Sequence, residues 1–154
     1  MLARFLPGAS SVRPFLHRLR GVRIHGKVFI GDDVYLENEH PECVEIHDEA
    51  IIGLRSTIVA HTRGAGEVII ERQAVLGAGC ILICAVNQKL VIGQGAVIGA
   101  GSVVSRSVPA RTLCSGPKAQ VLAKVTVPLT MEANYDAFIS GLRSLDKPPD
   151  PNHH

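Results

Sequence analysis

Histidine is the residue type in this chain best suited to proton transfer near neutral pH, and the sequence holds seven of them. His61 differs from the others because it lies beside a short stretch at 62–66, Thr-Arg-Gly-Ala-Gly, that separates two aliphatic segments. A side chain at such an interruption need not lie against a hydrophobic core. We therefore expect His61 to face a crevice, where a neutral imidazole can act as a general base. An ordinary exposed histidine is the simpler alternative.

The other histidines have plainer interpretations. His25 and His47 each follow directly after an isoleucine, and we interpret both as solvated turn residues. His40 lies in a polar segment and could approach a substrate, although a surface loop position explains it equally well. The remaining three lie towards the ends of the chain, at His17, His153 and His154.

The four cysteines form no Cys-x-x-Cys pair, and the first residues lack the apolar run of a signal peptide. Cys80 and Cys84 have no base beside them in the sequence, so we interpret both as packing residues rather than nucleophiles. Reduced thiols of this kind are typical of a cytoplasmic protein, which is the location we expect.

Composition excludes two classes of partner. The formal net charge is +2, with 4% aromatic residues and no clustered basic stripe, so we expect no nucleic-acid partner. The longest apolar stretches, at 75–86 and 90–104, are interrupted by glycine and polar residues, so we expect no membrane span.

A six-residue repeat positions these candidate side chains. Aliphatic residues recur at every sixth position, with four-residue insertions after 36 and after 82, and Gly64 is the one position in the series that is not aliphatic. An even period returns side chains to the same face of a strand, whereas a helix would rotate them away. Glycine often follows the repeated residue, where a sharp corner needs conformational freedom. The aliphatic anchors are Ile24, Ile30, Leu36, Ile46, Ile52, Ile58, Ile70, Leu76, Leu82, Ile92, Ile98 and Val104.

This repeat predicts an all-β fold, a parallel β-helix of triangular cross-section with about four coils stacked about 4.8 Å apart. An aliphatic interior that excludes rings agrees with the scarcity of aromatic residues. Because open coils expose unpaired backbone groups, we expect covers at both ends. The predicted organisation is an N-terminal helical cap at 1–21, the β-helix at 22–124, a C-terminal helix at 125–146 and a disordered tail at 147–154.

Residues 92–109, Ile-Gly-Gln-Gly-Ala-Val-Ile-Gly-Ala-Gly-Ser-Val-Val-Ser-Arg-Ser-Val-Pro, resemble the terminal coils of hexapeptide-repeat acyltransferases related to maltose and galactoside O-acetyltransferases. Residues 35–42 and 52–63 resemble members encoded with polysaccharide-modifying enzymes. The likeness covers most of 22–122. It implies a left-handed β-helix, a homotrimer, and acetyl-CoA bound between neighbouring subunits as the acyl donor. It also implies transfer to a hydroxyl or amine of a small acceptor, such as a sugar.

The resemblance also implies roles for particular residues. His61, in the Ala-His-Thr-Arg match, would be the general base. The positions that match coenzyme contacts are Ala78, Ala100, Ser105 and Arg106, and those that match the acceptor side are Glu37 and Asn38. The chain departs from the family at 116–119, where Gly-Pro-Lys-Ala replaces the usual Gly-Asn-Pro-Ala and puts the nucleotide contacts in doubt.

Two alternatives stay open. One is a catalytically silent trimeric scaffold or binding module, which the altered ending at 116–119 would permit. The other is a metal-dependent hydro-lyase resembling γ-type carbonic anhydrases, which needs three histidines. Only His40 or His47 could join His61 in such a site, so we expect no metal.

Overall fold

The computed structural model describes residues 6–62, 64–116, 123–128, 130 and 134–144. It divides into two compact units, Met1–Pro117 and Lys118–His154, which are described separately below. The described helices include none that is long and apolar enough to cross a membrane.

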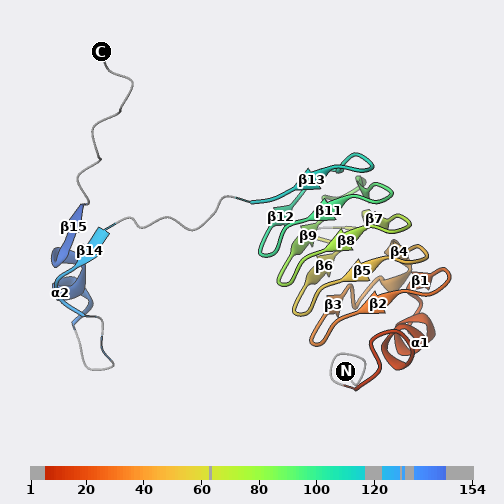
Figure 1. Cartoon of the computed structure of the whole chain (residues 1–154), viewed down its shortest axis with the longest axis horizontal. Helices are drawn as coiled ribbons and strands as arrows, with labels where there is room; N and C mark the ends of the chain where they lie inside the picture. Colours follow the sequence, from red (N-terminus) through yellow and green to blue (C-terminus); the bar gives the residue numbers. More distant parts are fainter. Residues whose placement is uncertain (1–5, 63, 117–122, 129, 131–133, 145–154) are drawn as a thin grey trace, which may run out of the picture. The chain divides into compact units, whose positions relative to one another are not determined.

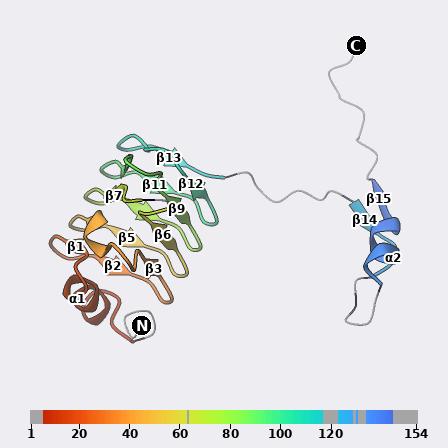
Figure 2. The same ribbon diagram turned by 180° about the vertical axis from the view of Figure 1, so that it is seen from behind.

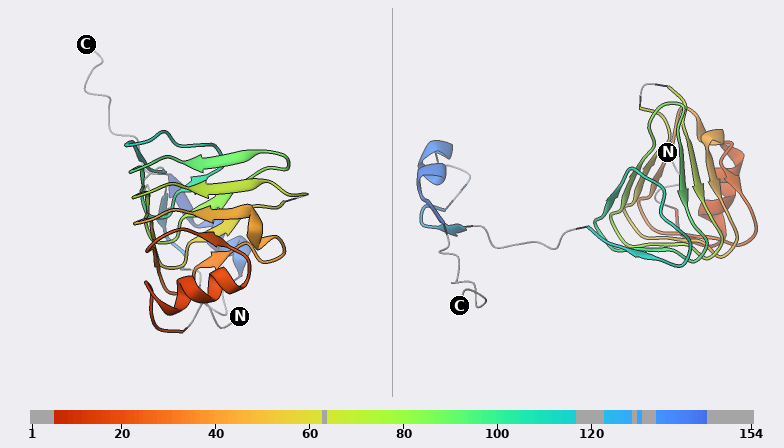
Figure 3. Two further views of the ribbon diagram at one scale, coloured as in Figure 1. Left: turned by 90° about the vertical axis from the view of Figure 1, so that its right-hand side faces the viewer. Right: turned by 90° about the horizontal axis from the view of Figure 1, so that it is seen from above.

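The first unit is a parallel β-solenoid of about four coils, which confirms the predicted fold class (Figure 1). Viewed along the stack it has a triangular outline (Figure 3, right). That the solenoid is left-handed remains a prediction from the family resemblance. One face is the sheet of β1 (Arg23–Ile24), β4 (Val44–Ile46), β7 (Glu67–Ile70) and β10 (Lys89–Ile92). The second is β2 (Phe29–Ile30), β5 (Ile51–Ile52), β8 (Val75–Leu76), β11 (Val97–Ile98) and β13 (Leu113–Cys114). The third is β3 (Tyr35–Leu36), β6 (Thr57–Val59), β9 (Ile81–Ile83) and β12 (Val103–Val104).

The core consists of the predicted aliphatic anchors. All twelve are buried, and equivalent anchors stack in register from coil to coil, as Ile24, Ile46, Ile70 and Ile92 do. Small residues four positions later, such as Ala50 and Ala74, complete the interior. The period of six therefore predicts correctly which side chains are removed from water, and this burial is the main stabilising contribution to the fold.

The interruption at 62–66 is an insertion rather than a failed strand. Gly64 is not an inward anchor; it lies in a loop that leaves the solenoid after β6 and returns at β7. The two insertions recognised from the sequence follow β3 and β9, and the loop at 62–66 follows β6. All three insertions therefore lie at the corner between the third face and the first. At this insertion corner the extra residues form loops that leave the solenoid, and His40, Thr62 and Val86 in these loops are exposed. The first loop contains a 3-10 turn at Pro41–Cys43.

Helix α1 (Val12–Leu19) covers the first coil, as predicted for the N-terminal segment (Figure 2). It does so with a polar face: Arg13, Pro14 and His17 are buried, whereas Phe15 and Leu19 of the apolar stripe are exposed. The reason lies in backbone polarity. Each inner coil pairs its backbone with the coils on both sides, but the first coil has no coil before it. The backbone groups of its inward residues therefore face the cap: the N–H of Ile30 donates to Ala9 O, and the carbonyls of the inward residues need donors.

Arginines supply the donors that these carbonyls need. Arg13 donates to Ile30 O at 2.8 Å, Arg18 to Ile24 O at 3.0 Å and Arg20 to Leu36 O at 3.2 Å, so each face of the first coil receives one guanidinium. An aliphatic cap would bury these acceptors unpaired, at a cost of about 1–3 kcal/mol each.

Replacing Arg13 by methionine is therefore expected to destabilise the solenoid by about 1–3 kcal/mol, because the buried carbonyl of Ile30 loses its donor. Urea unfolding followed by far-UV circular dichroism measures the change. Arg72→Met, at an exposed position, is the matched control and should stay within about 0.5 kcal/mol of the parent. Equal stability of all three proteins would contradict this account of the cap.

The second unit contains β14 (Ala123–Val125), α2 (Tyr135–Ser140) and β15 (Leu142–Ser144), with the two strands paired antiparallel. The helix is shorter than the predicted 125–146 segment. It begins where the Asn134 side chain accepts the backbone N–H of Asp136, and it ends at Gly141. The predicted tail at 147–154 lies outside the described residues.

Candidate active site

His61 lies on the second loop of the insertion corner, directly after β6 and the buried Ala60. Its backbone forms an antiparallel bridge with Ala65, which closes the loop. Its side chain is 28% exposed, so the ring is neither buried in the core nor free in solvent. The ring therefore lies outside the aliphatic core, and its role as the general base stays a prediction.

The imidazole is paired with a buried carboxylate from the preceding coil. Glu37 follows β3, and the register pair of Leu36 with Ile58 places it beside the end of β6. Its Oε1 lies 3.5 Å from Nδ1 of His61. The Glu37 carboxylate accepts hydrogen bonds from the backbone N–H groups of Ala60 at 3.0 Å, Asn38 at 2.8 Å and Glu39 at 3.0 Å. The pair thus links two successive coils.

These backbone donors keep Glu37 ionised. Burial by itself raises the pKa of this carboxyl, but hydrogen bonds from the backbone of Glu39, Ala60, Asn38 and His40 together lower it below its ordinary value. In the tautomer that carries its proton on Nδ1, the ring directs that N–H towards Glu37. Nε2 can then accept a proton once the exposed carboxylate of Glu39, which lies 3.2 Å from it, moves away. The arrangement is that of a base with its orienting group.

Two further side chains surround the ring. Oε2 of Glu39, an exposed residue, lies 3.2 Å from Nε2 of His61. The ring of His40 packs edge-on against that of His61, with centroids 5.2 Å apart. The sequence offers one sign of this cluster, the two glutamates at 37 and 39 beside an insertion, but nothing in the spacing pairs them with His61 of the next coil.

The two predicted acceptor residues, Asn38 and Glu37, have different surroundings in the structure. Asn38 is exposed, and its side-chain oxygen accepts a hydrogen bond from Arg20 at 3.0 Å. Glu37 is 1% exposed and its oxygens face backbone N–H groups and His61. We therefore interpret Glu37 as a positioning residue for the imidazole rather than as a contact for the acceptor.

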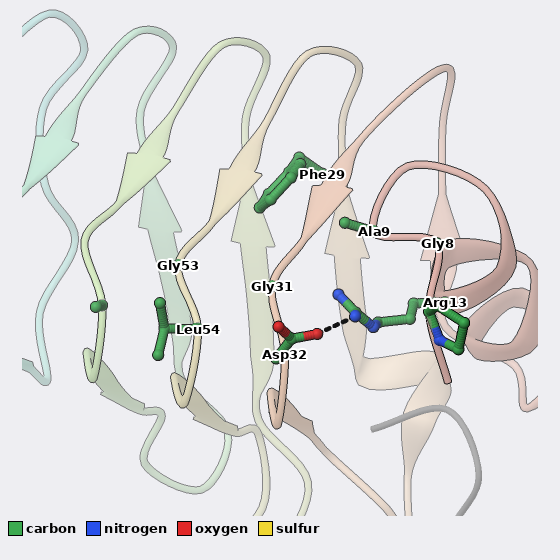
Figure 4. A pocket seen from close by; sticks show the side chains of 10 residues that line it. Gly8, Ala9, Arg13, Phe29, Gly31, Asp32, Gly53 and Leu54 are labelled. Carbon is green, nitrogen blue, oxygen red and sulfur yellow. Dashed lines mark hydrogen bonds and ion pairs between the residues drawn. The ribbon is translucent and has the colours of Figure 1, made fainter. Parts of the chain in front are cut away.

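The predicted coenzyme residues lie at other places on the solenoid. Ala78 lines a groove of about 620 Å³ along the corner between the second and third faces, together with Phe29, Asp32 and Leu54 (Figure 4). Successive coils touch at this corner: a Cβ on Gly77 would lie 2.5 Å from the backbone N of Ala100, so Ala100 continues the same column. Arg13 reaches the groove from the cap and pairs with Asp32 (Figure 4).

Ser105 and Arg106 line a second cavity of about 580 Å³ near the last coil, with Leu113 and Ser115. Neither cavity is lined by His61. A single chain therefore holds the imidazole and the predicted coenzyme residues apart. The altered segment at 116–119 lies outside the described residues except for Gly116.

The four cysteines are free. Cys80 is buried and donates to Gly99 O, and burial raises the pKa of its thiol, so the expected packing role agrees with its surroundings. Among the described residues one group has the chemistry of metal ligands: His25, Glu45 and His47, on a corner different from that of His61.

Comparison with known proteins finds relatives of one kind. Serine acetyltransferase 4 of Arabidopsis thaliana is 31% identical over 109 residues, covering 68% of this chain and 30% of the relative. The bifunctional protein GlmU of Polaromonas naphthalenivorans is 30% identical over 125 residues, 73% of this chain and 26% of the relative. A 2,3,4,5-tetrahydropyridine-2,6-dicarboxylate N-acetyltransferase of Staphylococcus aureus is 34% identical over 82 residues, 53% of this chain and 31% of the relative.

The matched region thus spans about a third or less of the length of these relatives. No family model matches the chain, and no solved structure matches it.

Proposed function

Because this chain is a homologue of hexapeptide-repeat acyltransferases, we propose that it transfers an acetyl group from acetyl-CoA to a hydroxyl or amine of a small acceptor, with a sugar as the favoured class. The observation that carries the proposal is the pairing of His61 with the buried, ionised Glu37. A silent scaffold has no need of a desolvated carboxylate directed at an imidazole, so this pairing favours an enzyme.

In the proposed reaction His61 removes the proton from the attacking hydroxyl or amine. Glu37 holds the proton on Nδ1, and Nε2 accepts the acceptor's proton as its oxygen or nitrogen bonds to the thioester carbon. The carbon–sulfur bond then breaks, the acetyl group stays on the acceptor, and His61 returns the proton to the departing thiolate. Glu39 contacts Nε2 in the free protein, and because it is exposed, an incoming acceptor can displace it.

We propose that the coenzyme lies along the column of Ala78 and Ala100, which offers little side-chain bulk, with Ser105 and Arg106 meeting its phosphates. These residues do not line one cavity with His61 in a single chain, so the proposal requires a neighbouring subunit to complete the site. A homotrimer, as the family resemblance implies, would supply it.

The second face of the solenoid offers a surface for such an assembly. Its outward side chains run in register from coil to coil, as Phe29, Ile51, Val75, Val97 and Leu113. A contiguous apolar stripe is unusual on a monomer and is typical of an interface. We expect light scattering to give the mass of three chains. The Ile51→Lys, Val97→Lys double variant should give that of one, and Gln73→Lys, at an exposed corner, should remain trimeric.

Release of free thiol from acetyl-CoA tests the function directly. The purified chain should release thiol in the presence of sugar hydroxyl or sugar amine acceptors, and the rate should depend on the acceptor. Absence of release with every acceptor from a folded trimer would instead favour the scaffold.

A further inference from the structure

His25 and His47 occupy equivalent positions in the first two coils. Each directly follows an inward isoleucine, and Ile24 pairs in register with Ile46. Stacked coils lie about 4.8 Å apart, and the two imidazole centroids are 4.9 Å apart. Both rings stand at the corner between the first and second faces of the solenoid, so the fold itself brings them together.

Glu45, the outward residue of β4, completes the group. Its Oε1 lies 3.0 Å from Nε2 of His25 and 3.1 Å from Nε2 of His47. All three candidate ligand atoms lie within 4.8 Å of one another. A tetrahedral zinc ion bonds nitrogen and oxygen at about 2.0–2.2 Å, which places neighbouring ligand atoms about 3.4 Å apart. Small side-chain rotations therefore suffice to admit an ion among the three atoms.

The surroundings hold Glu45 in place. Arg23 contacts its other oxygen, Oε2, at 3.2 Å and leaves Oε1 directed at the imidazoles. The charge of Arg23 is offset by Glu67 at 2.6 Å, and Glu67 also contacts Lys89 at 3.1 Å. Such outer contacts orient ligands and are a regular part of metal sites.

We propose that His25, Glu45 and His47 form a binding site for one divalent transition-metal ion of the zinc class. Imidazole and carboxylate ligands suit Zn²⁺, whereas Mg²⁺ and Ca²⁺ require mostly oxygen ligands. The His25 and His47 side chains are 55% and 38% exposed, so a water molecule can occupy the fourth position. The site lies on a different corner from His61 and does not depend on acyl transfer.

The repeat also explains why the site has these three ligands. The equivalent position in the third coil is Glu71, whose Oε2 accepts the backbone N–H of Gln94 at 2.7 Å. The equivalent position in the fourth coil is Gly93. Among the described residues, the stack of imidazoles at this corner therefore contains only His25 and His47, from the first two coils.

Titration of the metal-free chain with Zn²⁺ tests the proposal, with binding followed by calorimetry and with Co²⁺ as a spectroscopic probe. The parent carries His153→Ala and His154→Ala, because an adjacent histidine pair can itself bind metal. We expect one equivalent of Zn²⁺ per chain and the absorption bands of tetrahedral Co²⁺. His47→Ala or Glu45→Gln should weaken binding by more than about 100-fold, and Arg23→Met by about tenfold.

His40→Gln is the matched control, since it removes another exposed histidine and should bind Zn²⁺ as the parent does. Zinc should also raise the Tm of the parent and of this control but not that of His47→Ala. Circular dichroism of each variant verifies that the solenoid is intact. Absence of Zn²⁺ binding by the parent, or equal affinity in His47→Ala, would overturn the proposal.

Discussion

Replacing His61 by alanine is expected to lower kcat for acetyl transfer by about 10²–10⁴. The acceptor would then attack with its proton still in place, and the buried charge of Glu37 would have no imidazolium to stabilise. Thiol release from acetyl-CoA measures the rate. The side chain lies on a loop outside the aliphatic core, so the variant should keep the parent's circular dichroism spectrum and the parent's mass in light scattering.

Two further variants separate the roles within the site. Glu37→Gln keeps the size of the side chain and removes its charge. It should lower kcat, because the imidazole loses the carboxylate proposed to orient it.

Arg106→Ala should raise KM for acetyl-CoA while changing kcat little, since Arg106 is proposed to bind the phosphates of the coenzyme. Unchanged turnover in His61→Ala would remove the imidazole from the mechanism.

The solenoid is expected to lose about 3 kcal/mol of stability between pH 6.5 and pH 4 through one residue, His17. Burial, reinforced by the nearby positive charge of Arg20, lowers the pKa of this imidazole from 6.5 to about 4. Its Nδ1 lies 3.0 Å from an Arg20 nitrogen, and its buried Nε2 has no hydrogen-bond partner among the described residues, so the folded protein accommodates only the neutral ring.

The sign follows from proton uptake. As the pH falls below 6.5 the histidine of the unfolded chain takes up a proton while that of the folded chain does not, so acid favours unfolding until the pH reaches about 4. Well above pH 6.5 the imidazole is neutral in both states and this contribution is constant. Urea midpoints measured across this range give the slope.

His17→Leu removes the titrating group and should flatten the acid limb of the stability profile by this amount, whatever its effect at neutral pH. Leu19→Ala is the matched control, because Leu19 lies on the exposed side of the same helix and should keep the parent's slope. Parallel profiles for the parent and His17→Leu would show that the ring is accessible to protons in the folded state.

Much of the solenoid follows from the sequence alone. A period of six specifies which side chains face inward, and the buried anchors from Ile24 to Val104 confirm it. The same pattern located two of the three insertions, those that follow β3 and β9. It misjudged Gly64, because a longer excursion of the chain and a failed repeat look alike when only spacing is visible.

The N-terminal helix shows where the hydrophobic pattern of a sequence fails to identify the buried face. Apolar residues at helical spacing predicted the helix correctly, but its buried face carries Arg13 and His17. The hydrophobic stripe was a poor guide there because the end of a parallel coil presents unpaired backbone groups, and these require hydrogen-bond partners rather than aliphatic contacts.

What the sequence by itself determined is local and periodic: the strands, the aliphatic core, two of the corner insertions and a place for His61 outside that core. What only the tertiary structure decided is which polar side chains meet. Glu37 and His61 come from different coils, as do His25 and His47, and stacking places them within a few ångströms. Their contact depends on how many residues each coil contains, so the pairing of functional groups emerges only once the chain is wound.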